Sequence, residues 1–553
     1  MMCIKLQNLA AAPIAALILV QAALGSAEDA PTYERDIRPL FAKRCTVCHN
    51  ARKVDDPDLS GGLALDGHEA VLRGSKEHRV IVPGTAEQSE LYRRICEEDE
   101  DRRMPLFEKP LAEPERALIK RWIDAGVPRG EPSTAVAAMP KRPIRRALRS
   151  LDVIVPTEAK VPKETRGMES GGTLEVALKV GPLPAVSALA FRGDGRQLAV
   201  GTYGAVVVWD LADARPAIAL QDIPGPVHAL AFSRDGRRLA VGSGMPAQSG
   251  SVRVYTVPDG TLELDLEGHG DVVYALAFRP DGAQLASAGF DQTVRLWSLI
   301  NGRLEGVFHG HSDFVYEVAY LPDGRTLLSA SKDRSIKRFD GRTVKGIRTF
   351  SDHDDDVLAL AVRPDGTGFV SAGNEPQLRW WTLDGEKPHR KVGGHAGPVH
   401  QLCFSGDGKR LISASGDKSI RLWDGSTGIF QRSLPGPTDW QYAVALSHDA
   451  HLAAAGGWDG LVRVWDADAG KLLGTLLQPL SQSPGATDWL AIAPSGHIAA
   501  SQELLPLLRW RLGGAEVAGD APARAFIDPG LVARSLQGEP IASPFVAASP
   551  SAK

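Results

Sequence analysis

The chain has 553 residues, more than one ordinary domain holds, so at least two independent hydrophobic cores are expected. Its formal net charge is -4, which gives no basic excess of the kind that binding to a phosphate backbone requires. The composition therefore argues against nucleic acid as a partner.

Residues 1–27 have the pattern of a secretory signal peptide. Lys5 precedes an apolar run over 9–24, and small residues follow that run. An uncleaved membrane anchor is the alternative, but Pro13 and Gln21 interrupt a run already shorter than the roughly 20 residues that a span needs. We expect export, to the periplasm or beyond, and no membrane span in the mature chain.

Residues 31–130 predict a small all-α domain with two helical patterns, over 33–44 and 114–125. The second pattern has Pro114 in its first turn, and Leu118 and Trp122 fall on one face. The next stretch, 131–172, is rich in proline and basic residues without a sustained period. It predicts a linker.

Cys45, Cys48 and His49 form a C-x-x-C-H motif inside the small domain. This spacing is typical of covalent haem c attachment, in which two thiols bond the vinyl groups and the adjacent imidazole binds iron. A redox dithiol or half of a zinc site is the alternative. No second paired-cysteine or paired-histidine motif supports it, and the chain is expected to be exported. We therefore predict one covalent haem c.

Residues 33–130 resemble the planctomycete-type cytochrome c domain, through YERDIRPLFAKRCTVCH, GGLALD, IVPGTAEQSELYRRI, DRRMP and ALIKRWIDAGV. In that family a methionine followed by proline is the sixth iron ligand, which implies Met104 with Pro105. The family usually has a second proline where Leu106 stands here. A thioether ligand raises the reduction potential relative to a second histidine. His68 and His78 are the competing ligands, and Cys96 is expected to be a small buried hydrophobic residue.

Residues 173–512 repeat one template eight times, with an apolar strand, an Asp-Gly turn and a closing aromatic in most units. Most neighbouring closing aromatics are 42 residues apart. They are Trp209, Tyr255, Trp297, Phe339, Trp381, Trp423, Trp465 and Trp510. Such strands cannot bury both faces alone, so we expect four-stranded blades stacked into an all-β propeller. Eight blades are favoured, with the strand-like segment at Thr173 completing the last one. Seven blades are the alternative, because the last unit is degenerate.

The repeats resemble WD repeats, through their Gly-His and Trp-Asp patterns. That resemblance implies a buried tetrad of histidine, serine, aspartate and tryptophan in each complete blade, which fixes blade geometry and is unsuited to catalysis. Two sets are complete and two are altered by Phe339 and Glu375. The positions are His269, Ser287, Asp291 and Trp297; His395, Ser413, Asp417 and Trp423; His311, Ser329 and Asp333; and His353, Ser371 and Trp381.

A second aligned set stands at the start of each inner strand and is mostly aromatic or polar. Equivalent residues of successive inner strands form a ring near one rim, so this set suits a partner-binding surface. Packing between blades is the alternative. The rim residues are His228, Tyr274, Tyr316, His400 and Tyr442, aligned with Ser187, Leu358 and Asp488. Residues 513–553 predict a largely irregular tail, apart from a short helix near Leu531.

Together these features predict an exported c-type cytochrome that transfers single electrons, with the propeller as a docking platform for a redox partner protein. No catalytic constellation is visible beyond the haem motif. Two alternatives stay open. One is a haem-containing periplasmic oxidoreductase with a second cofactor or substrate site in the propeller, and the other is a structural interaction propeller with an accessory haem.

Overall fold

The structure is a computed structural model. It describes residues 31–38, 40–41, 63, 65, 67–74, 79–97, 104, 111–129, 153–161, 172–178, 180–479, 487–512, 515–516 and 526–542. The chain divides into two compact units, residues 1–143 and 144–553. Among the described residues no helix has both the length and the apolar character needed to cross a bilayer.

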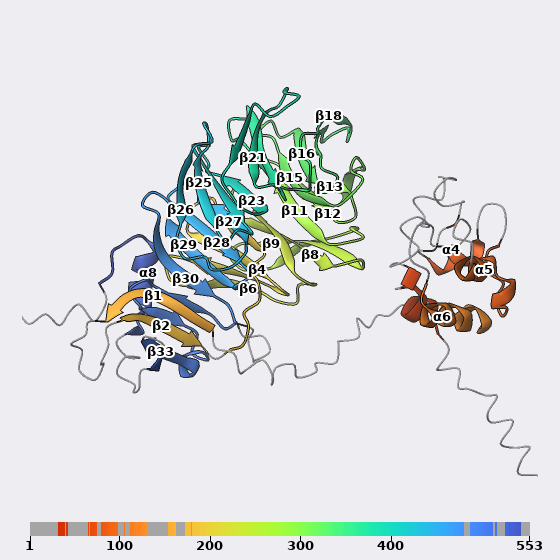
Figure 1. The fold of residues 1–553 in the computed structure, drawn as a ribbon, viewed down its shortest axis with the longest axis horizontal. Coiled ribbons are helices and arrows are strands. Elements are labelled where there is room, and N and C mark those ends of the chain that lie inside the picture. Colours follow the sequence, from red (N-terminus) through yellow and green to blue (C-terminus); the bar gives the residue numbers. More distant parts are fainter. Residues whose placement is uncertain are drawn as a thin grey trace, which may run out of the picture. The chain divides into compact units, whose positions relative to one another are not determined.

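The described elements of the N-terminal unit are all helical (Figure 1). They are η1 (Tyr33–Ile37), α4 (His68–Arg73), η2 (Ala86–Gln88), α5 (Glu90–Cys96) and α6 (Glu113–Asp124). The pattern expected over 114–125 is present as α6, and η1 lies at the start of the pattern expected over 33–44, of which residues 39 and 42–44 lie outside the described part. At the start of α6, Glu115 accepts a hydrogen bond from the Ala112 N–H at 2.8 Å, which satisfies one of the donors that a helix start leaves unpaired.

Three aromatic rings form the centre of the N-terminal core. Tyr33, Phe41 and Trp122 are buried, with ring centroids between 5.9 and 6.4 Å apart. Burial of three such rings supplies much of the apolar contact that a domain of this size can make.

The C-terminal unit consists mainly of eight antiparallel sheets, seven of four strands and one of six. In seven of them the strands lie side by side in chain order, from an inner to an outer strand. The inner strands are β3 (Ala188–Phe191), β7 (Val227–Phe232), β11 (Val273–Phe278), β15 (Val315–Tyr320), β19 (Val357–Val362), β23 (Val399–Phe404) and β27 (Gln441–Leu446).

The second strands are almost entirely buried, and the third strands carry the closing aromatic. The second strands are β4 (Gln197–Thr202), β8 (Arg238–Met245), β12 (Gln284–Gly289), β16 (Thr326–Ser331), β20 (Gly368–Gly373), β24 (Arg410–Ser415) and β28 (Leu452–Gly457). The third strands are β5 (Ala205–Asp210), β9 (Ser249–Thr256), β13 (Val294–Ser298), β17 (Ile336–Asp340), β21 (Gln377–Thr382), β25 (Ile420–Asp424) and β29 (Leu461–Asp466).

The outer strands are the most exposed. They are β6 (Arg215–Leu220), β10 (Leu262–Glu267), β14 (Leu304–Phe308), β18 (Gly346–Phe350), β22 (Arg390–Gly393), β26 (Phe430–Leu434) and β30 (Lys471–Leu477).

The conformation of the Asp-Gly turns between first and second strands follows from these two residue types. In the turn before β12, Gly282 takes a φ of 72° and the Asp281 carboxylate accepts the Ala283 N–H at 3.0 Å.

The seven inner strands contact one another in chain order, and β27 in turn contacts β3. Their side chains pack against the next sheet on each side, so apolar clusters lie between neighbouring sheets. The inner strands therefore stand around a common axis, which places equivalent residues of successive sheets next to each other.

The eighth repeat does not add an eighth inner strand. Its first two strands, β31 (Leu490–Ile492) and β32 (Ile498–Ala500), extend the last sheet outward from β30. Asp488, aligned above with the rim residues, therefore precedes a strand on the outer side of the last sheet. The structure does not confirm the count of eight blades.

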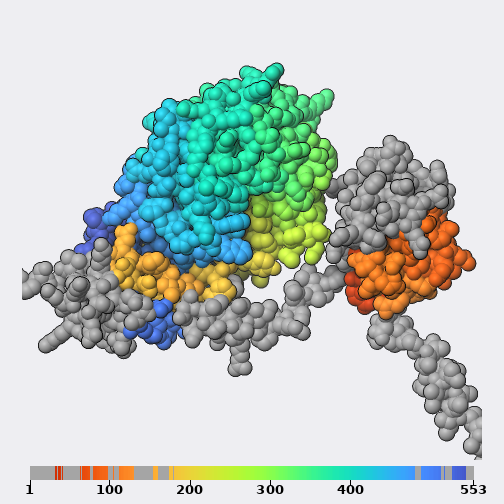
Figure 2. Space-filling view, viewed as in Figure 1, coloured from red at the N-terminus to blue at the C-terminus, as the bar shows by residue number. Residues whose placement is uncertain are grey.

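The closing strand of the eighth repeat lies in a separate sheet. This sheet has the order β1 (Val153–Val161), β2 (Gly172–Leu178), β33 (Leu508–Leu512) and β34 (Ala515–Glu516), and η5 (Leu505–Leu507) precedes β33. Val176 of β2 pairs with Trp510, so the segment at Thr173 does pair with the last unit as expected. In Figure 2 the orange β1 and β2 adjoin the blue C-terminal residues.

Two elements fall in segments expected to be irregular. β1 lies inside the stretch assigned to a linker. Its alternate residues Val155, Thr157 and Ala159 point inward and are buried, which is why this segment forms a strand. The helix near Leu531 is confirmed as α8 (Pro529–Leu536), which contacts β30 and β32 (Figure 1). The tail after β34 thus contributes to the core of the C-terminal unit.

Candidate functional site

The C-x-x-C-H motif formed by Cys45, Cys48 and His49 lies outside the described residues, as does His78. Met104 is described. It is partly buried and packs against the apolar core of the N-terminal unit, and its backbone N–H donates to the Arg94 carbonyl at 2.9 Å. This bond ties the Met104 backbone to α5.

His68, the competing ligand, is engaged elsewhere. Its Nε2 lies 2.8 Å from the Val127 carbonyl oxygen, and its ring packs edge-on against Tyr33 with centroids 5.5 Å apart. A nitrogen that donates to a carbonyl has no lone pair for iron. Because Cys45, Cys48 and His49 lie outside the described residues, Met104 as the sixth ligand stays a prediction.

The described side chains that pack around Met104 in the N-terminal unit are mainly apolar. No group of three or more histidine, cysteine or acidic side chains that could hold a metal occurs among the described residues. Cys96 is partly buried beside the core, as expected for a small hydrophobic residue. A soft thioether at the edge of an apolar core is the setting that suits an apolar macrocycle with an iron centre.

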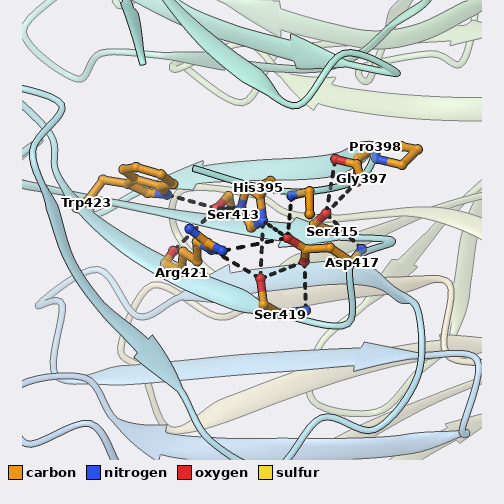
Figure 3. Close-up of polar contacts among 10 residues, drawn as sticks. His395, Gly397, Pro398, Ser413, Ser415, Asp417, Ser419, Arg421 and Trp423 are labelled. Atoms are coloured by element: carbon orange, nitrogen blue, oxygen red, sulfur yellow. Dashed lines mark hydrogen bonds and ion pairs between the residues drawn. The ribbon is translucent and has the colours of Figure 1, made fainter. Parts of the chain in front are cut away.

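The predicted tetrads are confirmed in the C-terminal unit, and Figure 3 shows the one around His395. The His395 Nδ1 lies 2.9 Å from Asp417, its Nε2 lies 2.7 Å from the Ser413 hydroxyl, and Trp423 donates to that hydroxyl at 2.8 Å. An ionised carboxylate only accepts, so Nδ1 carries the proton and Nε2 accepts from serine. The donors thus run in one direction from tryptophan to aspartate.

The altered tetrads keep the same arrangement. In one, Glu375 replaces aspartate 3.0 Å from His353 and pairs with Arg379, as Asp291 pairs with Arg295 in a complete tetrad. In the other, Phe339 cannot donate to serine and stacks instead on Phe308 at 4.3 Å. These groups link the second and third strands within their sheets.

Electrostatics confirm the structural role of these groups. Burial alone would raise the pKa of the Asp291 carboxyl, but the hydrogen bonds that it accepts from His269, Thr293 and the Gly270 N–H help to lower that pKa overall. Burial, followed by the charge of Arg379, lowers the pKa of His353 to about 4. The His353 imidazole is therefore neutral at physiological pH.

The rim residues stand where the inner strands bulge. In β11 the pairing shifts by one residue between Val273 and Ala275, so Tyr274 has no partner on β12. The same shift occurs at His228, Tyr316, Leu358, His400 and Tyr442. A bulge redirects the side chain of the extra residue, and bulges often lie beside binding sites.

The rim aromatics form two stacks. In the first, His228 stacks on Tyr274 at 4.4 Å and Tyr274 on Phe290 at 5.0 Å. Phe290 in turn stacks on Phe314 at 4.2 Å, and Tyr316 meets Tyr274 edge-on at 5.4 Å. The predicted ring residues are thus brought together, and Phe290 and Phe314 extend them.

The second stack contains the rim's most exposed aromatics. His400 lies 6.2 Å from Trp440 and 5.3 Å from Tyr442, which meets Trp458 edge-on at 6.5 Å. Trp440 is 47% exposed and Trp458 is 62% exposed, and Tyr203 in the equivalent β4–β5 turn is 59% exposed. Large exposed aromatics that gather on one face are typical of an interaction surface.

Sequence reasoning missed several rim residues because it aligned only the inner strands. Phe290, Trp458 and Tyr203 occupy the turn between second and third strands of their sheets, so an alignment of those turns would have found them. It also missed Glu317, the one acidic residue on the described inner strands, which follows Tyr316.

The comparisons with known families match both parts of the chain. The model of the Planctomycete cytochrome C family matches residues 45–105, a range that holds the C-x-x-C-H motif and Met104. The WD domain, G-beta repeat model matches six times, over 219–256, 260–298, 302–340, 345–382, 386–424 and 428–466. This chain joins a planctomycete-type cytochrome c domain to WD repeats. A search of curated proteins found none that matches it.

The six matched WD repeats account for most of the inner ring. The cytochrome domain match begins at Cys45, the first residue of the motif, and ends one residue after Met104. The unmatched first repeat of the WD region still forms a complete sheet from β3 to β6, whereas the unmatched eighth repeat is the one whose strands are redistributed.

Proposed function

We propose that this protein is an exported c-type cytochrome in which one haem, bound covalently by Cys45 and Cys48 with His49 and Met104 at the iron, carries single electrons. The cytochrome family match over 45–105, which holds all four residues, is the observation that carries the proposal. Haem supplies a reversible one-electron couple whose potential depends on the axial ligands. The described core of this unit, which includes Tyr33, Phe41 and Trp122, is apolar, in keeping with an apolar prosthetic group.

The WD-repeat region acts as the docking platform for a redox partner protein. Seven inner strands contact in order and β27 contacts β3, which supports a seven-bladed propeller with the eighth repeat packed outside the ring. The exposed aromatics of the rim, with Trp440, Trp458 and Tyr203 on adjacent sheets, supply the contact surface.

The haem proposal is tested on the mature protein from a host that matures c-type cytochromes. We expect the mass to exceed that of the chain by one haem, and the alkaline pyridine spectrum to show one haem c per chain. An unmodified mass would overturn the proposal. Absorbance beyond one haem would show a second cofactor and favour the oxidoreductase alternative. Amino-terminal sequencing of the same sample tests removal of residues 1–27.

The docking proposal is tested by replacing Tyr274 and Tyr316 together with alanine. Buried tyrosines at protein interfaces commonly cost on the order of 1 to 4 kcal/mol when truncated, so recovery of the redox partner from periplasmic extract should fall at least tenfold. Reduction of the haem by the eluted partner identifies it as the redox partner. Equal recovery by both proteins would contradict the proposal, and a large fall in melting temperature would show that these rings only pack between blades.

A further inference from the structure

The sheet of β15 holds a lysine side chain at the rim through two contacts. The Lys332 Nζ lies 4.9 Å from the centroid of the Phe314 ring and 3.8 Å from the Asp313 carboxylate. Two backbone donors fix this frame: the Lys332 N–H donates to the Phe314 carbonyl at 2.9 Å, and the Phe314 N–H donates to the Asp313 carboxylate at 2.8 Å. An aromatic face beside a carboxylate is a favourable setting for an ammonium group.

The sheet of β27 repeats this frame without a lysine of its own. The Trp458 N–H donates to the Trp440 carbonyl at 2.9 Å, and the Trp440 N–H donates to the Asp439 carboxylate at 2.9 Å. Trp458 therefore stands where Lys332 stands in the sheet of β15. The side chains of Asp439 and Asp313 are both 37% exposed, so the two carboxylates are equally accessible.

The two indoles of this second frame are open to solvent. Trp440 is 47% exposed and Trp458 is 62% exposed, whereas the equivalent Phe290 in the sheet of β11 stacks on two other rings. Lys418 of the preceding sheet lies 3.8 Å from the Asp439 carboxylate. Over either indole, however, no cationic side chain is recorded within the described part of the chain. The place that Lys332 takes on its own ring is thus free on these two.

The charges at the rim favour a cationic occupant. Four sheets have an aspartate that accepts the N–H of the next residue at 2.7 to 2.9 Å: Asp271, Asp313, Asp355 and Asp439. Asp354 and Asp356 add two carboxylates beside the third of these. The adjacent turns between second and third strands supply fewer cationic groups, namely Lys332, Arg334 and Lys418. This excess of negative charge is complementary to a basic protein surface.

We propose that the Trp440–Trp458 pair anchors a lysine or arginine side chain of a basic partner protein, with the Asp439 carboxylate as its counter-charge. This inference rests on the proposed docking function and names the chemistry of the partner. The cationic side chain would lie on an indole face as Lys332 lies on Phe314. A basic residue at the centre of the partner's contact surface would fit this position.

The test uses the full-length protein and three acetylated tetrapeptide amides, of arginine, lysine and citrulline, titrated by calorimetry at low and at high salt. Citrulline keeps the shape of arginine without its charge. We expect saturable binding of the arginine or lysine peptide that weakens as the salt concentration rises. The citrulline peptide should bind more weakly than the arginine peptide by roughly fivefold or more.

Two variants probe the frame itself. Trp458→Lys places a lysine at the position of Lys332 and should weaken binding of the cationic peptides by roughly fivefold or more, because its own ammonium group takes the site. Asp439→Asn removes the counter-charge, keeps an oxygen for the Trp440 N–H and should also weaken binding. The matched control is Ile300→Lys, which adds the same charge at a residue that is 84% exposed in the turn between β13 and β14, at the other end of the strands. It should change the affinity much less.

Two results would overturn the inference. One is the absence of saturable binding for both cationic peptides, and the other is equal affinity of Trp458→Lys and Ile300→Lys, which would mean that the peptides respond only to net charge. If Trp458→Lys lowers the melting temperature, Asp439→Asn decides instead, and an affinity equal to that of the wild-type protein overturns the inference.

Failure of the docking function itself is a separate result. Partner capture that depends on Tyr274 and Tyr316 but is unchanged in Trp458→Lys and Asp439→Asn would leave the docking function standing and remove only the cation position.

Discussion

The Ser413 hydroxyl links a donor, the Trp423 N–H, with an acceptor, the His395 Nε2. Its hydroxyl accepts from Trp423 and bonds to His395 Nε2, and all three side chains are buried. Ser413→Ala leaves the indole N–H and the imidazole nitrogen unsatisfied, which costs about 1–3 kcal/mol. We expect unfolding of the WD-repeat region, monitored by circular dichroism, to have a lower urea midpoint. Ser426→Ala, in an exposed turn after β25, should leave the midpoint unchanged.

As the proposed sixth ligand, Met104 would set how strongly the haem iron favours the reduced state. A thioether ligand stabilises ferrous iron, so Met104→Ala should lower the reduction potential while the haem stays covalently attached. Spectroelectrochemical titration measures the change. His68→Ala is the control and should leave the potential nearly unchanged, because His68 bonds to the Val127 carbonyl. If His68→Ala lowered the potential and Met104→Ala left it nearly unchanged, His68 would be the ligand.

His228 makes the stability of the WD-repeat region depend on pH. Burial lowers its pKa from 6.5 to about 4, so between these values the unfolded chain binds more protons than the folded one. Stability is therefore full above pH 6.5 and falls as the pH drops toward 4. The melting temperature should fall less between pH 7 and pH 5 in His228→Leu, which copies Leu358. The same fall in both proteins would contradict this assignment.

At the scale of single elements, α8 anchors the tail to the last sheet. Leu536 and Val532 lie in the same core cluster as Leu473 and Leu476, and Ser535 donates to the Leu473 carbonyl at 2.7 Å. Leu536→Ala should destabilise the WD-repeat region by roughly 2–5 kcal/mol in chemical unfolding.

The matched control for α8 is Arg534→Ala. Arg534 is exposed and pairs only with Glu539 near the surface, and exposed pairs contribute little to stability. Similar losses for Leu536→Ala and Arg534→Ala would mean that α8 does not depend on its buried face.

Most strands could be predicted because their signals are local. Alternating apolar residues, Asp-Gly turns and closing aromatics predict the strands, and the resemblance to WD repeats implies the tetrads. The eighth repeat could not be placed this way. Its residues follow the template, but whether β31 pairs with the ring or with β30 depends on contacts far along the chain. β1 was missed because Pro156 and the basic neighbourhood conceal its alternation.

The candidate site was predictable in part for the same reason. A shared offset identifies Tyr274 and its equivalents, but Phe290 lies in a later turn, and its stacking on Tyr274 is visible only in the structure. The haem motif is the opposite case. Its three residues lie within five positions, and their spacing alone predicts covalent haem attachment without any long-range information.

At the scale of the whole molecule, the two units have separate hydrophobic cores. We therefore expect fragments 1–143 and 144–553 to fold when produced apart. The first should keep the absorption spectrum of the full-length protein, and the second should keep the melting temperature of the WD-repeat transition. A fragment 144–553 that melts markedly earlier would show that the cytochrome domain stabilises the repeats.

The pairing of β2 with β33 has a consequence for biosynthesis. β2 is among the first strands of its unit to be made, and its partner is among the last. One edge of β2 therefore stays open until almost the whole unit has been synthesised, and an open strand edge is a template for aggregation. A chain that ends before Leu508 can never cover this edge. A late nonsense mutation should therefore be far more damaging than its small loss of residues suggests, and truncated chains should accumulate as aggregates or be degraded.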